Sequence, residues 1–275
     1  MIRFDHVSKI YPGGTRAVED FSLTVEQGST TVFLGTSGCG KTTLMRMVNA
    51  MVTPTSGTVF VRDQDVAGED PVRLRRSIGY VLQEGGLFPH RTVADNIATV
   101  PRLEGASKAE SRERALELLA LVGLDREMAD RYPAQLSGGQ RQRVGVARAL
   151  ANRADILLMD EPFGALDPIV RADLQRELKE IQRALGTTIL FVTHDVDEAF
   201  TLGDQVAVLS TGGRIEQVGT PAELLSSPAS PFVAEFVGAS RAARPVHLAG
   251  SDGLIVDEAG TPVGTLTTDE AGERP

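Results

Sequence analysis

Residues 35–42 read Gly-Thr-Ser-Gly-Cys-Gly-Lys-Thr, and this glycine-rich segment constrains the fold of the chain more than any other. Two glycines separated by four residues and followed by Lys and Thr fit the loop that holds the phosphates of a nucleoside triphosphate. Glycines let backbone N–H groups turn toward the phosphates, Lys41 adds a full charge, and the hydroxyl of Thr42 can bind Mg²⁺. The β-rich residues 30–34 precede the segment, and an apolar helical pattern over residues 44–48 follows it. The sequence therefore predicts a strand, a phosphate loop and a helix in succession.

The composition limits the classes of partner that the 275 residues can have. The formal net charge is −9 and the pI is about 5.1. This balance argues against non-specific binding of nucleic acid, which depends mainly on neutralising phosphates. Cys39 is the single cysteine, so no internal disulfide can form and a reducing compartment is expected. A thiol at a helix N-terminus can be reactive, but a small side chain that fits the loop is the favoured interpretation.

The sequence contains no apolar run long enough to span a bilayer, and the residues after Met1 do not resemble a signal peptide. We therefore expect a cytoplasmic protein whose role at a membrane, if it has one, is exercised through partners.

Apolar patterning predicts strands on both sides of one helical region. Strands are expected at residues 2–7, 21–25, 30–34, 58–61, 77–82, 156–159 and 187–192, with a hairpin at 205–209 and 214–218. Residues 83–153 are expected to be mainly helical, and Ser107 and Glu110 have the spacing of a capping box. A helix at 173–185 between two buried strands predicts a right-handed crossover in a parallel sheet. Asp63 and Asp65 are interpreted as turn residues rather than as metal ligands.

A second glycine-rich segment starts a predicted helix. Ser137 suits an N-cap, and Gly138, Gly139 and Gln140 follow it. Read alone, Ser-Gly-Gly is an ordinary turn. In a chain that also carries a phosphate loop, it predicts a second helix N-terminus directed at an anion.

Polar side chains also follow three of the predicted strands. Asp160 and Glu161 end the strand at 156–159, where open α/β sheets bind their ligands. Asp160 is suited to hold Mg²⁺ through water, and Glu161 to polarise an attacking water. His194 ends the next buried strand and can contact the γ-phosphate or order that water. Gln83 is placed to reach Mg²⁺ or the water. Taken singly, these residues also fit surface turn charge, a structural histidine and a loop amide.

In their order, these motifs resemble those of the ATP-binding subunit of an ABC transporter over residues 1–238. The series includes Ala165-Leu166-Asp167 before His194. The resemblance implies an α/β P-loop NTPase of the ABC nucleotide-binding type, in which an antiparallel β subdomain and an inserted helical subdomain accompany a mixed sheet core. It implies a RecA-like core over 1–82 and 154–238 and a helical subdomain over 83–153.

The resemblance further implies that ATP and Mg²⁺ bind. Catalytic roles are expected for Glu161, His194 and Gln83, and Mg²⁺ ligation for Thr42, Gln83 and Asp160. Tyr11 would stack on adenine, with packing at a strand edge as the alternative. The other expected nucleotide contacts are Gly35, Ser37, Gly38, Cys39, Gly40, Lys41, Thr42, Thr43, Ser137, Gly138, Gly139 and Gln140.

The family also implies partners. Two copies pair head to tail, so that each Ser-Gly-Gly segment reaches the γ-phosphate held by the other copy. Integral-membrane permease subunits are expected to meet the chain near residues 86–93, and an extracytoplasmic substrate-binding protein acts through them. The expected place is the cytoplasmic face of the membrane, with no nucleic-acid partner.

Residues 159–171 look most like those of quaternary-amine importers, which take up osmoprotectants such as glycine betaine, choline or carnitine. An importer for a polyamine, an inorganic anion or a sugar is the alternative. A non-transport ABC ATPase is less favoured, because the chain is acidic and has neither a second nucleotide domain nor a long coiled coil.

The sequence departs from the family pattern in two places. Thr36 stands where many relatives have proline, which changes the stiffness of the loop but removes no phosphate contact. Residues 239–275 form an unusual tail, in which 254–266 resembles the strand-turn-strand piece of a cystathionine-synthase-type regulatory domain. A remnant β-hairpin and a disordered end both remain open.

Overall fold

The computed structural model describes residues 1–83, 85–164, 166–238, 246–249, 254–257 and 262–265. Contacts divide the chain into two compact units, Met1–Pro221 and Ala222–Pro275. The domain boundaries drawn from the sequence, at residues 82, 153 and 238, stay predictions.

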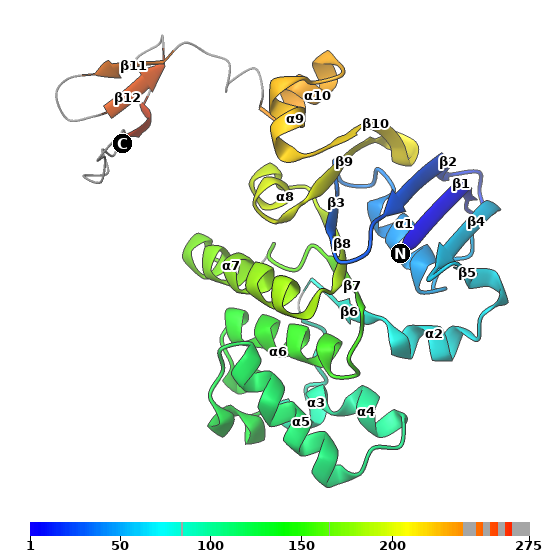
Figure 1. The fold of residues 1–275 in the computed structure, drawn as a ribbon, viewed down its shortest axis with the longest axis vertical. Helices are drawn as coiled ribbons and strands as arrows, with labels where there is room; N and C mark the ends of the chain where they lie inside the picture. The colour runs from blue at the N-terminus through cyan, green and yellow to red at the C-terminus, as the bar shows by residue number, and fades with distance from the viewer. Residues whose placement is uncertain (84, 165, 239–245, 250–253, 258–261, 266–275) are drawn as a thin grey trace, which may run out of the picture. The chain divides into compact units, whose positions relative to one another are not determined.

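An antiparallel sheet begins the first unit (Figure 1). Its strand order is β2-β1-β4-β5, from β1 (Ile2–Ile10), β2 (Arg16–Val25), β4 (Ser56–Val61) and β5 (Gln64–Asp65). Ile2, Phe4 and Val7 of β1 are buried. Ile2 and Phe4 follow the alternation of a strand with one solvated face, and the irregular register between Phe4 and Val7 lets Val7 be buried as well.

The central sheet has the order β10-β9-β3-β8-β7-β6. It contains β3 (Thr30–Gly35), β6 (Gly79–Val81), β7 (Ile156–Asp160), β8 (Thr188–Thr193), β9 (Gln205–Ser210) and β10 (Arg214–Gly219). All neighbouring pairs are parallel except β9 and β10, which form the predicted hairpin. Strands β3 and β8 are buried along their whole length, which explains their continuous runs of apolar and β-branched residues.

Helix α1 (Lys41–Val48) lies between the two sheets (Figure 1). Its buried side chains include Leu44, Met45, Met47 and Val48. Three phenylalanine rings close the same core: Phe4 and Phe21 are 5.2 Å apart between ring centroids, and Phe21 and Phe33 are 5.5 Å apart, both edge to face. The strand before the phosphate loop and the helix after it are therefore both held by the main core.

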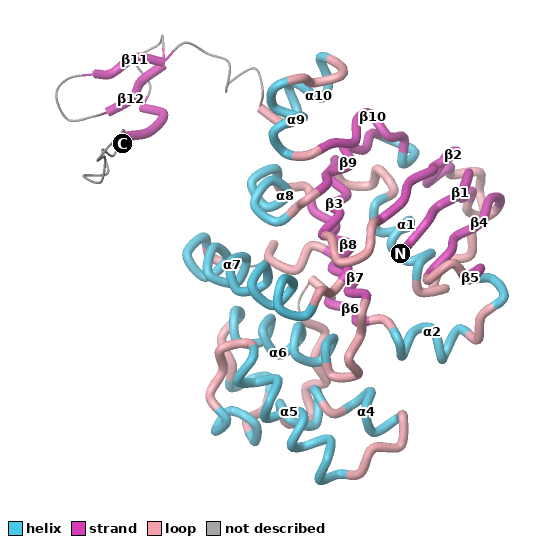
Figure 2. The backbone as a smooth tube through the Cα atoms, in the orientation of Figure 1, coloured by secondary structure: helices cyan, strands magenta, loops and turns pink. Residues whose placement is uncertain are grey.

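Helices occupy the stretch between β6 and β7 (Figure 2). They are α3 (Val93–Ile97), α4 (Thr99–Leu103), α5 (Lys108–Leu121) and α6 (Gly138–Leu150), with the 3-10 turns η2 (Arg126–Asp130) and η3 (Pro133–Gln135). The predicted capping box of α5 is present: the Ser107 hydroxyl accepts from the Glu110 N–H at 3.2 Å, and the Glu110 carboxylate accepts from the Ser107 N–H at 2.9 Å.

Helices α7 (Pro168–Leu185) and α8 (Val196–Leu202) lie on the face of the central sheet opposite to α1 (Figure 1). The remaining short elements of this unit are η1 (Val66–Gly68), α2 (Pro71–Ser77) and η4 (Thr211–Gly213). None of the helices in the described part of the chain combines the length and the apolar character needed to cross a bilayer.

At the C-terminal end of the chain the structure has α9 (Pro221–Ser226), α10 (Pro231–Phe236) and a three-stranded antiparallel sheet. The strands are β11 (Val246–Ala249), β12 (Leu254–Asp257) and β13 (Pro262–Thr265). Strands β12 and β13 fall within the segment for which a hairpin was considered, and β11 was not predicted. The connection over residues 258–261 lies outside the described residues.

The mixed α/β fold class is confirmed, and several element boundaries differ from the predictions. Strand β1 ends later than predicted, at Ile10, and β2 begins earlier, at Arg16. The strand expected at 77–82 is shorter, because Ser77 ends α2, a helix capped by Asp70. The helix expected from residue 173 begins at Pro168, where Asp167 is the N-cap and accepts from the Val170 N–H at 3.0 Å. Proline is favoured in the first helical turn, a start signal that the apolar pattern alone does not contain.

Candidate functional site

The phosphate loop connects β3 to α1 and is braced from both sides. Gly40 has φ 113°, and a Cβ there would lie 2.4 Å from the Ala17 carbonyl oxygen, so only glycine fits. The Gly213 N–H, in the turn between β9 and β10, donates to the Cys39 carbonyl at 2.6 Å. Cys39 itself is buried. The loop conformation is thus fixed by neighbouring backbone before any ligand is considered.

Lys41 is buried under this loop although it carries a charge. Its Nζ donates to the carbonyl oxygens of Gly35 and Thr36, each at 2.8 Å. A buried ammonium is tolerated only when its protons have partners. The two carbonyls hold the charge beneath the loop that presents backbone N–H groups to an anion. Of the other loop residues, Ser37 and Gly38 are exposed and Thr43 is partly buried.

Thr42, in the first turn of α1, meets Asp160 at the carboxyl end of β7. The Thr42 hydroxyl donates to Asp160 Oδ1 at 2.9 Å. Oxygen donors of this kind are what Mg²⁺ prefers, and this ion keeps several water or phosphate ligands. The pair therefore fits a Mg²⁺ ion, while no cluster of three or more His, Cys, Asp or Glu side chains suited to a metal occurs among the residues that the structure describes.

Two further side chains at Asp160 were not predicted. The Tyr80 hydroxyl lies 3.5 Å from Asp160 Oδ2, and Arg46 of α1 interacts with both residues. Burial raises the pKa of Asp160, against the opposing effects of the Thr42 hydroxyl and the Arg46 charge. Arg46 follows Thr42 by four residues, one helical turn, so the sequence did contain a signal that the two share a face of α1.

Asp160, at the end of β7, and Asp155, just before its start, are expected to affect the pH dependence of folding stability in opposite directions. The pKa of Asp160 is raised in the folded chain, so the folded chain keeps this proton to a higher pH than the unfolded chain does. The free energy of unfolding therefore falls as the pH rises from the unfolded pKa through the folded pKa. We expect Asp160→Asn to increase the free energy of unfolding at neutral pH, measured by urea unfolding without nucleotide or Mg²⁺.

Asp155, just before β7, provides the matched control. Its pKa is lowered mainly by Arg62, whose Nε donates to Asp155 Oδ2 at 2.9 Å. This contribution is present above the unfolded pKa and is lost as pH falls through the folded pKa. Asp155→Asn should therefore destabilise at neutral pH. Equal effects of the two substitutions would contradict the assigned burial of Asp160.

Glu161 and His194 meet beside this pair, at the ends of β7 and β8. His194 Nδ1 lies 3.1 Å from Glu161 Oε2, with 59% and 25% of the two side chains exposed. Glu161 has φ 45°, a left-handed backbone that is unusual for a residue other than glycine. Its N–H donates to the Val192 carbonyl at 2.9 Å. Strained backbone of this kind is common at functional sites.

Gln83 and Tyr11 are exposed and make no side-chain hydrogen bond with another described residue. Gln83 Nε2 lies near Gly164, 3.5 Å from the place that a Cβ would take. It also lines a cavity of about 430 Å³ together with Gly138. Tyr11 follows β1, and Lys9 Nζ lies 5.3 Å from the centre of its ring. Both side chains are available to a ligand.

The Ser-Gly-Gly segment forms the start of α6. The Ser137 hydroxyl accepts from the Gln140 N–H at 3.2 Å, and Gln140 Oε1 accepts from the Ser137 N–H at 3.0 Å. Gly139 is buried, and a Cβ there would lie 2.6 Å from Val170 Cγ1, so close packing on α7 requires this glycine. No hydrogen bond between described residues joins residues 137–140 to the phosphate loop. The structure therefore brings together Lys41, Thr42, Asp160, Glu161 and His194, but not this segment.

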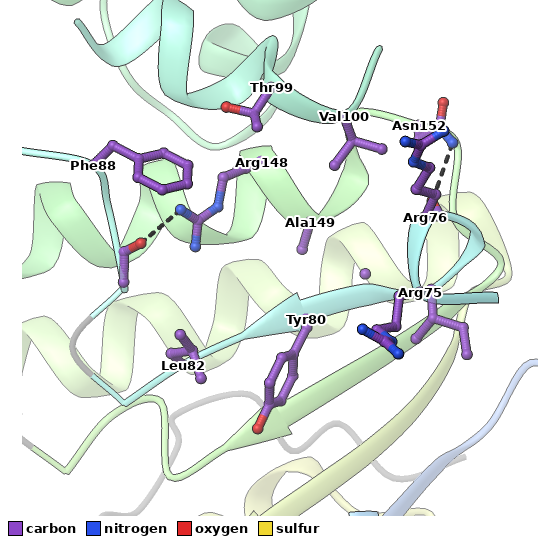
Figure 3. A pocket seen from close by; sticks show the side chains of 13 residues that line it. Arg75, Arg76, Tyr80, Leu82, Phe88, Thr99, Val100, Arg148, Ala149 and Asn152 are labelled. Carbon is purple, nitrogen blue, oxygen red and sulfur yellow. Dashed lines mark hydrogen bonds between the residues drawn. The ribbon is translucent and has the colours of Figure 1, made fainter. Parts of the chain in front are cut away.

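A second concave surface lies between β6 and the helical stretch (Figure 3). This cavity of about 410 Å³ combines apolar side chains with three arginines; its lining includes Leu82, Phe88, Val100, Arg75, Arg76 and Arg148. Arg148 donates to the Gly86 and Gly85 carbonyls at 2.7 and 2.8 Å, and burial lowers its pKa. Arg76 lies 3.2 Å from Glu104.

Comparisons with known proteins agree with this geometry. A family profile described as ABC transporter matches residues 18–164. The carnitine transport ATP-binding protein OpuCA of Listeria monocytogenes is 53% identical over 241 residues, which cover 88% of this chain and 60% of the relative. The glycine betaine uptake system ATP-binding protein YehX of Escherichia coli is 50% identical over 240 residues, 87% of this chain and 77% of the relative.

A solved structure described as a dimeric, post-hydrolysis state of the ATP-binding cassette MJ0796 bound to ADP and Pi matches with a TM-score of 0.73. It is 33% identical and covers 80% of this chain and 99% of its own. The chain spans about three-fifths of the length of the first curated relatives that it matches. On the profile, the relatives and the fold together, the chain belongs to the ABC transporter family.

Proposed function

We propose that this chain binds and hydrolyses ATP and thereby powers a membrane importer, which the resemblance assigns to the quaternary-amine class. The observation that carries the enzymatic part is the meeting of Thr42, in the first turn of α1, with Asp160 at the end of β7, and of Glu161 with His194 at the ends of the adjacent parallel strands β7 and β8. Open α/β sheets bind their ligands at this edge.

In this proposal the phosphate loop holds the β- and γ-phosphates. Backbone N–H groups at the start of α1 face the phosphate oxygens, and Lys41 supplies the positive charge. Mg²⁺, held by Thr42 and Asp160 with Gln83 as a further ligand, would neutralise charge on the phosphate oxygens. Tyr11 supplies an exposed ring on which the adenine stacks.

Glu161 acts on the attacking water. Its carboxylate accepts a proton from the water as the oxygen approaches the γ-phosphorus, and the terminal phosphate leaves ADP. His194 holds Glu161 through Nδ1 and directs its remaining ring nitrogen to the γ-phosphate. Gln83, whose side chain lies near Gly164, orders the same water in this proposal.

The pocket is completed by a second copy of the chain. Ser137 is exposed and is the N-cap of α6. The N–H groups of the first turn of a helix point out of its N-terminus, where they can bind an anion. We propose that Ser137, Gly138 and Gln140 of one copy contact the γ-phosphate held by the other, with Gly139 shaping the helix end. The dimeric cassette among the solved relatives supports a pair of copies, and the head-to-tail arrangement is part of the proposal.

The arginine-lined cavity between β6 and the helical stretch is proposed as the docking groove of a permease subunit. Its lining includes Leu82 and Gly86, on either side of Gln83 in the chain, so a permease bound there would lie close to Gln83. The apolar walls suit a helix, and the arginines suit acidic groups on it. Through this contact the chain would sit at the cytoplasmic face of the membrane, and a substrate-binding protein would act through the permease.

The cargo is proposed from resemblance alone. The printed functions of the relatives are carnitine transport and glycine betaine uptake. Both molecules are small quaternary amines. Measurement of labelled glycine betaine uptake into vesicles that contain the chain and its permease tests this part, with spermidine and sulfate as competing cargoes.

The enzymatic part is tested with the purified chain and its Lys41→Ala variant. The wild type should release phosphate from ATP in the presence of Mg²⁺. The variant should bind ATP at least about tenfold more weakly, since a hydrogen bond to a charged group contributes roughly 1.5–3 kcal/mol. Calorimetric titration measures the affinity, and Lys108→Ala on exposed α5 is the control. Unchanged affinity in Lys41→Ala would contradict the assigned phosphate loop.

The docking groove makes a separate prediction. Arg75 lines the groove and has no ion pair with another described residue. We expect Arg75→Glu to leave the ATPase activity of the isolated chain unchanged and to weaken permease binding about tenfold or more, because a charge of the wrong sign at an interface costs roughly 1.5 kcal/mol or more. Arg73→Glu on the same helix, outside the groove, is the control. Equal binding by both variants would place the permease elsewhere.

A further inference from the structure

Arg171 joins two loops that come from different parts of the sequence. It lies in the first turn of α7, with 27% of its side chain exposed. Its Nη2 donates to the Leu166 carbonyl at 3.2 Å, and its Nη1 donates to Asp195 Oδ2 at 3.0 Å. The two ends of one guanidinium therefore hold the segment before α7 and the segment after His194.

The residues on both sides of His194 are fixed by the same network. The Asp195 N–H donates to Thr193 Oγ1 at 3.0 Å, and the Thr193 hydroxyl donates to Glu198 Oε2 at 2.7 Å. Glu198 Oε1 lies 3.8 Å from Arg171 Nε. Asp195 Oδ1 also caps α8 by accepting from the Asp197 and Glu198 N–H groups.

The network includes Glu198, a carboxylate whose burial is energetically unfavourable. Its side chain is 3% exposed, and burial raises its pKa. A buried carboxylate beside a second acidic residue is maintained only where a cation offsets both, and Arg171 is that cation. Lysine has a single nitrogen and cannot hold two loops in the fixed geometry of a guanidinium.

The network leads from the start of α6 to the proposed site of hydrolysis. Leu166 Cδ2 lies 3.4 Å from the place that a Cβ on Gly138 would take. From Leu166 the contacts continue through Arg171 to Asp195 and Thr193, which flank His194, and His194 contacts Glu161 at 3.1 Å. The first step is a proximity of Leu166 to Gly138, the steps through Arg171, Asp195 and Thr193 are hydrogen bonds, and His194 is the chain neighbour of both Thr193 and Asp195.

We infer that Arg171 is a positioning residue for ATP hydrolysis. It holds His194 in place against Glu161 and couples this placement to the position of Leu166 and of the start of α6. This inference rests on the proposed ATPase function. Arg171 touches neither ATP nor the water. The competing explanation is that Arg171 only packs α7 against α8, in which case its loss lowers stability without a selective effect on hydrolysis.

The first test is Arg171→Lys, which keeps the charge and removes the fork. We expect kcat to fall roughly 10- to 100-fold, because small displacements of catalytic groups have effects of this size. The KM for ATP should change less than about threefold, since the phosphate loop is untouched. Arg176→Lys is the control on the same helix, because Arg176 is exposed and Asp173 is its ion-pair partner among the residues that the structure describes. A kcat of Arg171→Lys within twofold of wild type would overturn the inference.

The second test asks whether Arg171 acts through His194. In a His194→Ala background, Arg171→Lys should cause almost no further loss of kcat, because the residue that it positions is gone. Multiplying losses would show an independent effect and would refute the inference. Asp195→Asn gives a second route if Arg171→Lys folds poorly, since asparagine still caps α8 but cannot pair with Arg171.

The results also separate this inference from the proposed function. A wild-type chain that releases no phosphate from ATP would remove the ATPase proposal itself. A wild-type chain that is active, with Arg171→Lys and Asp195→Asn equally active, would remove only the role of Arg171.

Discussion

Replacement of Glu161 by glutamine is expected to leave ATP bound and hydrolysis nearly stopped. The side chain keeps its shape and its contact distance to His194, but an amide cannot accept the proton of the attacking water. General-base groups contribute roughly 10²- to 10⁴-fold to rate, so kcat for phosphate release should fall by about this factor while ATP affinity is retained.

The same variant should accumulate as an ATP-bound dimer. If ATP joins two copies and hydrolysis releases them, a chain that binds without turnover stays paired. Size-exclusion chromatography with and without ATP measures this. Glu180→Gln, on the exposed surface of α7, should change neither rate nor mass. Rapid turnover by Glu161→Gln would remove Glu161 as the group that activates water.

Ser137→Arg is expected to spare ATP binding in the phosphate loop of its own chain and to lower hydrolysis about 10²-fold or more, because a group that stabilises the transferring phosphate has effects of this size. Ser107→Arg is a close control. Ser107 is the N-cap of α5 in the same type of capping box, but it lies away from the site. Its replacement should therefore lower the stability of the chain by a similar amount, about 1 kcal/mol, without affecting the pocket.

Mixing two inactive variants tests whether the pocket is shared. A pair formed by Ser137→Arg and Lys41→Ala has one pocket with an intact phosphate loop and an intact Ser-Gly-Gly segment, and one pocket with both defects. Single-turnover phosphate release should therefore recover in the mixture, up to roughly a quarter of wild type for random pairing of independent sites. If each chain builds its own pocket, the mixture stays as inactive as its components.

Local sequence signals predicted the elements whose geometry is local. The phosphate loop needs glycine at a left-handed position, and Gly40 has that conformation. The box of Ser107 and Glu110 predicted where α5 begins. Continuous apolar runs predicted the buried parallel strands, and the carboxyl ends of those strands then brought Asp160, Glu161 and His194 to one edge of the sheet.

Contacts between distant segments were not predictable in the same way. Nothing near Arg171 in the sequence indicates that its two ends reach Leu166 and Asp195, because the second contact depends on how α7 lies against α8. Tyr80 was read as part of a strand, and its approach to Asp160 follows from the pairing of β6 with β7. The role of Gly139 in helix packing also needed the position of Val170. The roles assigned to individual site residues stay predictions.

The three phenylalanine rings that link the sheets have a consequence for how ligand affinity should be interpreted. Phe33 lies in β3, two residues before the phosphate loop, and packs edge to face against Phe21 of the other sheet. Helix α1, which follows the loop, is buried in the same core through Leu44, Met45, Met47 and Val48. The receptor for the phosphates is thus rigid in advance, and a nucleotide need not organise it on arrival. A change in nucleotide affinity caused by a substitution on the rim of the loop should consequently report a lost contact with the nucleotide. Substitution of a ring by a smaller side chain should instead slow or weaken nucleotide binding, although no group that contacts the nucleotide is changed.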